Sequence, residues 1–141
     1  MDKFELEKRT KQFAIRIIKF AATLPYGKIG DVIRYQLVKA GTSVGANYRE
    51  ANRAESRNDF IHKVGIVEKE ASESQYWLEI CDESNLGDAQ QRKWLLAESE
   101  NFSLSSPVPE GRRKQRGFEI PQSEIHNSKS YVSNHRSNPV D

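Results

Sequence analysis

The sequence predicts an all-α protein built as an up-down antiparallel four-helix bundle, and three observations carry this prediction. Five prolines occur among the 141 residues, but none lies between residues 26 and 106. Within that span, apolar residues recur every three or four positions, which is the period of an α-helix. Short groups of turn-forming residues interrupt the pattern. We expect the bundle to occupy residues 1–106 and residues 107–141 to form a disordered tail.

Caps and breaks in the first half of the chain place two helices. Asp2 is a suitable N-cap for a helix that runs to about Thr23, where Leu24-Pro25-Tyr26-Gly27 breaks it. A second helix is expected from Ile29 or Asp31 to about Ala54. Each has one apolar stripe that should face the core: Phe13, Ile17, Phe20 and Leu24 in the first, and Ile29, Val32, Ile33, Leu37, Ala40, Val44 and Ala51 in the second.

Two capping patterns open the remaining helices. Ser56, with Asp59 three residues later, resembles a capping box and predicts a third helix that runs to about Glu83. Its stripe alternates by four and three, as in a left-handed bundle: Phe60, Val64, Val67, Ala71, Ser74, Leu78 and Cys81. After a turn at residues 85–87, Asp88 and Gln91 repeat the capping pattern and predict a fourth helix.

The fourth helix is expected to be short. Apolar residues are grouped at residues 94–97, and no clear stripe is visible from Ser99 to Ser106. Pro107 and Pro109 then prevent the helix from continuing. The chain from Pro107 onward is polar and aperiodic, so we expect it to be disordered and to add nothing to folding.

Charge is distributed unevenly along the chain. Residues 1–69 contain 14 Lys/Arg and 8 Asp/Glu, whereas residues 70–106 contain 2 and 8. The basic half could bind a polyanion such as RNA or DNA. Alternatively, it could face the acidic stretch of another copy and set the register of an oligomer.

Six cations on the outer sides of the first two helices are the candidate nucleic-acid ligands: Lys8, Lys11, Lys19, Arg34, Arg49 and Arg53. Arginine suits this role because its guanidinium donates two parallel hydrogen bonds to a phosphate. An ordinary solvated face explains the same residues equally well.

More apolar surface is present than one seam needs, so we expect self-association. Gly41 and Gly45, which a helical wheel places outward, suggest close approach of a neighbouring helix or subunit, because glycine inside a helix otherwise costs about 1 kcal/mol. The predicted oligomer interface contains Ile15, Gly41, Gly45, Ile66, Trp77 and Ile80. Gln36, Ser43 and Asn47 fall in the apolar sector; they could form a ligand pocket, but a satisfied polar layer that fixes helix register is favoured.

Nothing in the sequence favours an enzyme. His62 and Cys81 are expected on different faces of the third helix, and no metal-binding spacing is present. We therefore predict no catalytic residue, no metal and no cofactor. No apolar run approaches the roughly 20 residues of a membrane helix, and the charged N-terminus does not resemble a signal peptide. One cysteine in the whole chain suits the cytoplasm.

Four segments resemble the family of four-helix-bundle proteins encoded in the intervening sequences of bacterial 23S rRNA genes: residues 41–51 (GTSVGANYREA), 53–57 (RAESR), 59–63 (DFIHK) and 76–79 (YWLE). The resemblance covers about residues 4–98. It implies a ring-like homo-oligomer, typically a pentamer, and a basic surface that binds nucleic acid. Relatives in diversity-generating retroelements imply a reverse transcriptase as a partner. No catalytic residue is implied, and most motif positions look structural: Ser43, Asn47, Glu50, Arg53, Ser56 and Phe60.

The C-terminus departs from the family, whose fourth helix continues past the position of Glu98 as a regular amphipathic helix. We hypothesise that the reading frame shifts near residues 97–101. Two functions from different classes follow from the sequence. The first is a non-enzymatic, homo-oligomeric nucleic-acid-binding adapter. The second is a homo-oligomeric scaffold for a protein partner, in which basic and acidic faces meet between subunits.

Overall fold

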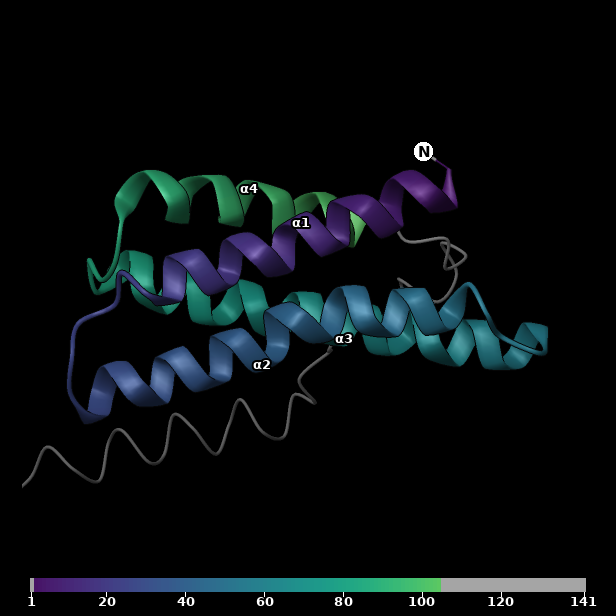
Figure 1. The fold of residues 1–141 in the computed structure, drawn as a ribbon, viewed down its shortest axis with the longest axis horizontal. Coiled ribbons are helices and arrows are strands. Elements are labelled where there is room, and N and C mark those ends of the chain that lie inside the picture. Colours follow the sequence, from purple (N-terminus) through teal and green to yellow (C-terminus); the bar gives the residue numbers. More distant parts are fainter. Residues whose placement is uncertain (1, 105–141) are drawn as a thin grey trace, which may run out of the picture. The chain divides into compact units, whose positions relative to one another are not determined.

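The computed structural model describes residues 2–104, and these form four α-helices joined by short turns (Figure 1). The helices are α1 (Lys3–Ala21), α2 (Lys28–Ala51), α3 (Arg57–Glu83) and α4 (Ala89–Leu104). The all-α prediction is confirmed. The predicted tail, residues 107–141, lies outside the described residues.

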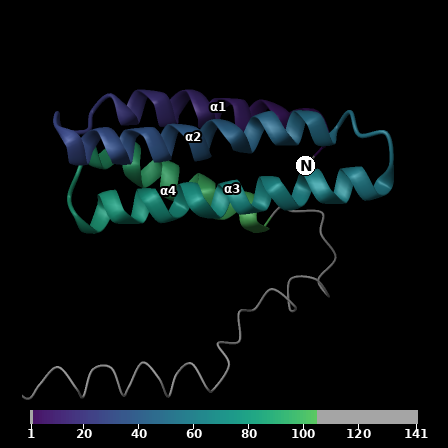
Figure 2. The same cartoon turned by 90° about the horizontal axis from the view of Figure 1, so that it is seen from below.

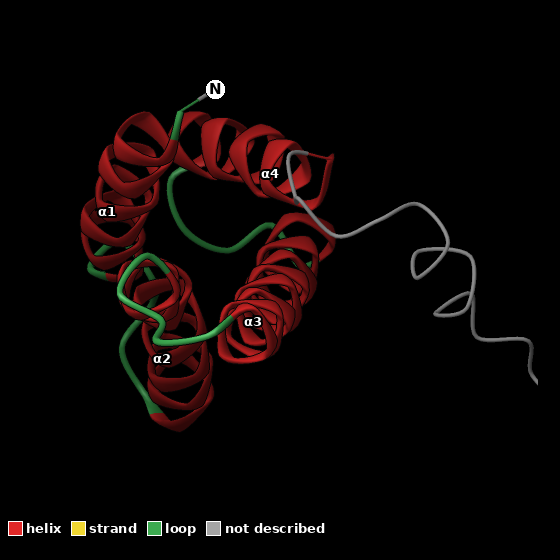
Figure 3. Ribbon diagram, turned by 90° about the vertical axis from the view of Figure 1, so that its right-hand side faces the viewer, coloured by secondary structure: helices red, strands yellow, loops and turns green. Residues whose placement is uncertain are grey.

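Each helix runs antiparallel to the next one and packs against two neighbours (Figures 1 and 2). The pairs in contact are α1–α2, α2–α3, α3–α4 and α1–α4. The end-on view in Figure 3 shows the four helices at the corners of a square around one core. This is the up-down bundle that short turns between amphipathic helices impose.

The three predicted caps are confirmed. The side-chain oxygens of Asp2, Ser56 and Asp88 accept hydrogen bonds from backbone N–H groups three residues later, at 2.8, 3.1 and 2.8 Å. Each bond satisfies one of the N–H groups that a helix leaves unpaired at its start. The second helix has no side-chain cap and begins after Gly27, whose φ of +118° favours glycine.

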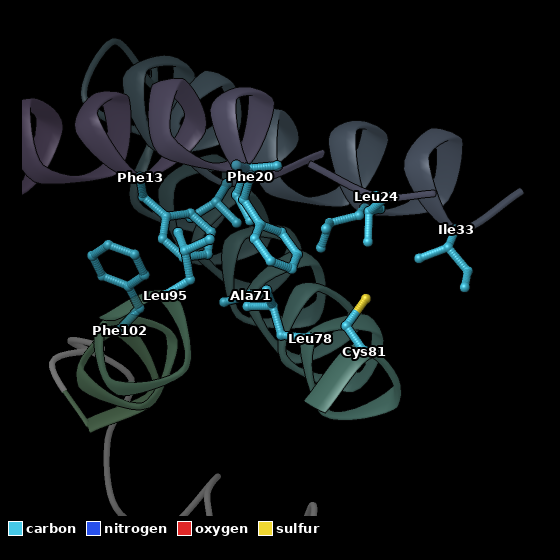
Figure 4. Packing of buried hydrophobic residues seen from close by; sticks show 12 residues of the cluster. Phe13, Phe20, Leu24, Ile33, Ala71, Leu78, Cys81, Leu95 and Phe102 are labelled. Carbon is cyan, nitrogen blue, oxygen red and sulfur yellow. The ribbon is translucent and has the colours of Figure 1, made fainter. Parts of the chain in front are cut away.

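The predicted apolar stripes of α1 and α3 lie in the core, whereas the predicted stripe of α2 lies there only in part (Figure 4). Phe13, Ile17 and Phe20 are fully buried, as are Leu78 and Cys81. Ile29 and Val32, however, were predicted to be buried, and they are 76% and 56% exposed.

The start of α2 explains this difference. Gly30 is buried against the backbone of Pro25, so closely that a Cβ atom at this position would clash with the Pro25 carbonyl. With Gly30 in this contact, Gly30 and Ile33 lie on the side of α2 that faces the protein. Ile29 and Val32 are therefore turned toward solvent, because successive helix residues are about 100° apart.

The expectation that α4 loses its pattern at Ser99 is wrong. Leu95, Ser99 and Phe102 are buried at intervals of four and three residues, and they continue the stripe. The Phe102 ring meets the Phe13 ring edge to face, with centroids 5.2 Å apart (Figure 4). The hypothesis of a change of reading frame near residues 97–101 stays a prediction. At 16 residues, α4 is still the shortest of the four described helices.

Buried hydroxyls lie in the core at positions other than those predicted. The hydroxyls of Thr10, Ser74 and Ser99 donate to carbonyl oxygens of their own helices at 3.0, 2.8 and 2.8 Å, so their burial leaves no donor unsatisfied. Ser43 and Asn47 are half-buried and bond to carbonyl oxygens within α2. These two bonds satisfy the side chains but do not link two helices, so they are not the predicted register-fixing layer.

Gly41 and Gly45 face α1 within the protomer, so the predicted close approach is to a neighbouring helix, and the prediction that they point outward to an oligomer interface is wrong. A Cβ atom at Gly41 would lie 2.7 Å from Cγ1 of Ile17, and one at Gly45 would lie 3.2 Å from the backbone of Thr10. Both positions therefore let α1 approach α2 closely. This approach offsets the helix-propensity cost of glycine.

Adding one methyl group at this contact should destabilise the bundle. We expect Gly41→Ala to lower the free energy of unfolding by about 1–3 kcal/mol, because Ile17 or the α2 backbone must move. Chemical denaturation measures this change, with Ser72→Ala at an exposed position of α3 as the control. An unchanged stability together with an altered oligomer size would instead restore the interface prediction for Gly41.

Candidate nucleic-acid interface

The six candidate cations fall into two groups in the structure. Lys8, Lys11 and Lys19 are exposed on α1, and none of them forms an ion pair with another described residue. Arg53 is also exposed and donates only to the carbonyl oxygen of Arg49, at 3.3 Å. These four side chains are available to an external anion.

Arg34 is a structural residue, so its predicted place among the outward cations is wrong. Its guanidinium donates to the carbonyl oxygens of Ala21 and Leu24 at 3.3 and 3.1 Å, where α1 ends. It also pairs with Asp31 at 2.7 Å. Ala21 is the last residue of α1, and a cation beside the C-terminus of a helix is favourable.

Arg49 is partly committed to a network between α1 and α2. Its Nε donates to Glu7 at 3.0 Å, and the Asn52 amide donates to the other oxygen of Glu7 at 3.1 Å. The Asn52 hydrogen bond and the Arg49 charge lower the pKa of the Glu7 carboxyl, with a further contribution from Arg53. The Arg49 side chain remains 51% exposed, so an external anion would compete with Glu7 for it.

One interhelical ion pair bridges each of the four packed helix pairs. Besides Arg49–Glu7 between α1 and α2, they are Lys63–Glu50 at 2.7 Å, Arg92–Asp82 at 2.8 Å and Arg9–Glu98 at 2.9 Å. The last is bidentate, since Arg9 Nε and Nη2 both donate to Glu98. Part of the charge asymmetry of the sequence is therefore neutralised inside one protomer.

A cationic cleft that the sequence did not reveal lies between α1 and α4. Arg16, Lys19 and Gln91 line a cavity of about 250 Å³. The Arg16 guanidinium lies over the Trp94 ring, 3.9 Å from its centroid, which is a close cation–π contact. No sequence spacing relates residues on α1 and α4, so only the three-dimensional packing brings these side chains together.

The predicted interface residues differ in their exposure. Ile15 is 37% exposed, whereas Ile66 and Ile80 are half-buried. Trp77 was predicted to lie on a second outer face, but it packs against the core cluster, and its indole nitrogen is buried. Trp77 is therefore mainly a core residue.

The most exposed apolar residues on the helices lie elsewhere. Those more than half exposed are Phe4 and Ile18 on α1, Ile29, Val32 and Tyr35 on α2, and Tyr76 on α3. On α2, an open groove of about 410 Å³ is lined by Asp31, Arg34, Tyr35, Val38 and Lys39. Ile29 and Val32 were predicted to lie in the core, so this exposed surface was not predicted from the sequence.

Two further groups concern chemistry. Cys81 is fully buried, and burial raises the pKa of its thiol. His62 is exposed on α3. Among residues 2–104, no three His, Cys, Asp or Glu side chains gather as metal ligands would. In the same part of the chain, no helix is long and apolar enough to span a membrane.

The comparisons with known proteins agree with this fold. The family model for the 23S rRNA-intervening sequence protein matches residues 2–105. The chain belongs to this family. Comparison with curated proteins gives no match.

A solved structure from the same group of proteins supports the assignment. It is a protein of unknown function from the S23 ribosomal protein family of Bacteroides thetaiotaomicron VPI-5482, and it shares 34% sequence identity with this chain. The alignment covers 74% of this chain and 93% of that one, with a TM-score of 0.67. The family match includes Glu98 and Phe102.

The lowered pKa of Glu7 gives a pH-dependent prediction. A carboxylate whose pKa falls on folding stabilises the native state above its unfolded pKa of about 4.3, and this contribution is lost as the pH falls through the folded value. Glu7→Gln should therefore lower stability at pH 7 and have a much smaller effect near pH 3. Urea unfolding at both pH values measures this, with Glu55→Gln in the exposed α2–α3 turn as the control. An equal loss at both pH values would show that the charge of Glu7 is not the cause.

Proposed function

We propose that the protein is a non-enzymatic, homo-oligomeric adapter that binds RNA or DNA. The observation that carries this proposal is the set of exposed cations without acidic partners in the described chain: Lys8, Lys11 and Lys19 on α1, with Arg53 on α2. Exposed cations that no carboxylate neutralises attract a polyanion and release its counterions on contact.

The neighbouring contacts bring Arg53 to the level of Lys8 and Lys11, whereas Lys19 lies in the last turn of α1. The Arg49–Glu7 ion pair joins α2 to α1. Glu7 directly precedes Lys8 on α1, and Arg49 lies about one helical turn before Arg53. Lys8 and Lys11 are three residues apart and therefore lie on one side of α1. A phosphate backbone that crosses α1 and α2 at this level would meet several cations, with Arg49 joining when it leaves Glu7.

Self-association belongs to the proposal because the α2 surface is apolar. Ile29, Val32 and Tyr35 expose large side chains beside the groove on α2. Contiguous exposed apolar surface of this kind favours an interface. By family resemblance the assembly would be a ring, a pentamer, in the cytoplasm. Repetition of the cationic surface around a ring would raise the affinity for a long polyanion through effective concentration.

The alternative function is a scaffold for a protein partner, and the same apolar groove is the observation that favours it. Its rim carries Arg34 and Lys39 together with Asp31, so an acidic and apolar segment would fit. By family resemblance the partner could be a reverse transcriptase. In this version the cations on α1 would have no ligand of their own.

Nucleic-acid binding is tested by paired charge-removing variants. Lys8→Gln/Lys11→Gln should weaken binding to unrelated duplex sequences by similar factors. It should also flatten the slope of log affinity against log salt by about 0.9 for each lost phosphate contact. The matched control Lys69→Gln/Lys93→Gln removes the same charge from exposed positions on α3 and α4 and should leave the slope unchanged. Fluorescence anisotropy between 50 and 200 mM salt measures both, roughly the range over which such slopes are resolved.

The scaffold function makes the opposite prediction for this experiment. It predicts no binding of nucleic acid by the wild-type protein at physiological salt. Equal losses in both double variants would show that net charge, and not the surface on α1, controls binding.

Self-association through α2 is tested by a change of polarity at an exposed position. Val32→Glu should shift the protein toward monomer without lowering its unfolding midpoint, because Val32 is 56% exposed in the protomer. Light scattering at micromolar concentration gives the oligomer size, and circular dichroism gives the midpoint. Trp77→Glu is the contrasting variant and should unfold the protein, since Trp77 packs against the core. A monomeric wild-type protein would contradict the proposal.

A further inference from the structure

The cleft between α1 and α4 has features that an electrostatic surface alone does not need. It is concave, it contains the only described arginine stacked closely on a tryptophan, and an amide side chain stands across from its cations. We propose that this cleft binds one unpaired nucleotide unit, a phosphate with its base. The inference rests on the proposed nucleic-acid binding, and it adds a preference for single strands.

Two cations in the cleft are available to a phosphate. Neither Arg16 nor Lys19 forms an ion pair with any residue in the described part of the chain. Arg34, Arg49 and Arg92, by contrast, are paired with carboxylates. Among residues 2–104, no acidic side chain lines the cleft. A phosphate there would thus meet two positive charges without having to displace an internal partner.

The Arg16–Trp94 pair supplies a planar surface for a base. Trp94 is half-buried, and its ring holds the guanidinium 3.9 Å from the ring centroid. A guanidinium has two faces, so the face away from Trp94 can stack on a nucleobase. Because the tryptophan already orders the arginine side chain, less conformational entropy is lost when the base binds.

Gln91 supplies a polar contact on the opposite side of the cleft. Its backbone N–H is used in the cap by Asp88, but no other described residue bonds to its side-chain amide. An amide offers both a donor and an acceptor, which is what the edge of a base requires. The cleft therefore combines a cationic part, a stacking surface and a hydrogen-bonding group.

The size of the cleft favours an unpaired nucleotide over a duplex. Its volume of about 250 Å³ is slightly below the roughly 300–1,000 Å³ of small-molecule sites, so the cleft can hold no more than one nucleotide unit. Bases in a duplex are stacked inside the helix and cannot enter, whereas unpaired bases can turn outward. Duplex phosphates would still contact Lys8 and Lys11 on the surface of α1.

The experiment compares a conservative arginine variant with the wild-type protein. Arg16→Lys keeps the charge but removes the planar stacking group. It should weaken binding of a single-stranded oligonucleotide by at least roughly fivefold, the lower end for the loss of one stacked base, and leave duplex binding unchanged. Gln91→Ala should have the same selectivity with a smaller loss. Lys8→Gln/Lys11→Gln is the control and should weaken single-strand and duplex binding alike.

A second measurement separates a free nucleotide from a strand and separates the two proposals. Adenosine monophosphate and inorganic phosphate are titrated while the indole N–H signal of Trp94 is followed by NMR. The monophosphate should shift this signal more than phosphate does, and Arg16→Lys should reduce the difference. If oligonucleotides bind but Arg16→Lys affects strands and duplex equally, and the monophosphate leaves the Trp94 signal unchanged, the cleft is not a nucleotide site. The proposed surface binding would stand in that case. If the wild-type protein binds neither strand nor duplex, both proposals fall.

Discussion

The close approach of α2 to α1 is the constraint on which much of the structure depends. Gly41 leaves no room for a Cβ atom against Ile17, and a Cβ atom at Gly45 would make a tight contact of 3.2 Å with the Thr10 backbone, so α2 packs closely on α1 at both positions. This distance brings Glu7 within hydrogen-bonding reach of Arg49 and Asn52. The packing around α1 is consequently asymmetric, because α1 packs more closely on α2 than on α4.

The opposite side of α1 has the complementary property. The α1–α4 pair is the least closely packed of the four. Long side chains span it: Arg9 reaches Glu98, and Arg16 reaches Trp94. The position of α1 close to α2 and farther from α4 explains both features: glycines line the α1–α2 contact, and long cationic side chains span the α1–α4 contact. The cleft forms between α1 and α4 because side chains, and not closely packed backbones, fill the space between these two helices.

Most of the fold could be predicted from the sequence, because its causes are local. The caps at Asp2, Ser56 and Asp88 need only a polar side chain and the N–H three residues later. The apolar stripe of α3 can be predicted from the spacing of its own residues. The predictions failed where a contact beyond the local sequence decides whether a residue is buried or exposed. Ser99 is polar in sequence, but it is buried because its hydroxyl bonds to Leu96, and Ile29 is apolar but exposed because Gly30 occupies the inner side.

The candidate site was harder to predict for a related reason. Sequence charge indicates how many cations a helix carries, but not which of them a carboxylate from another helix neutralises. Arg34 and Arg49 looked equivalent to Lys8 and Lys11, yet they are bound to Asp31 and Glu7. Arg16 was not among the predicted site residues, because its partner Trp94 is 78 positions away in the sequence.

The pairing of charges also bears on how the protein would choose between ligands. A cation that already has a carboxylate partner exchanges one anion for another, so the net gain from a phosphate is small. An unpaired cation gains the full interaction. The unpaired set in the described chain includes Lys8 and Lys11 on the open surface of α1 and Arg16 and Lys19 in the cleft. Both pairs are exposed, but only Arg16 and Lys19 line a cleft that a single nucleotide unit could enter. The two pairs lie on one helix, so a single strand that follows α1 could contact both and place a base in the cleft, whereas a duplex could contact the exposed cations without placing a base there. Preference for a strand then arises from shape, with the same charge chemistry at both places.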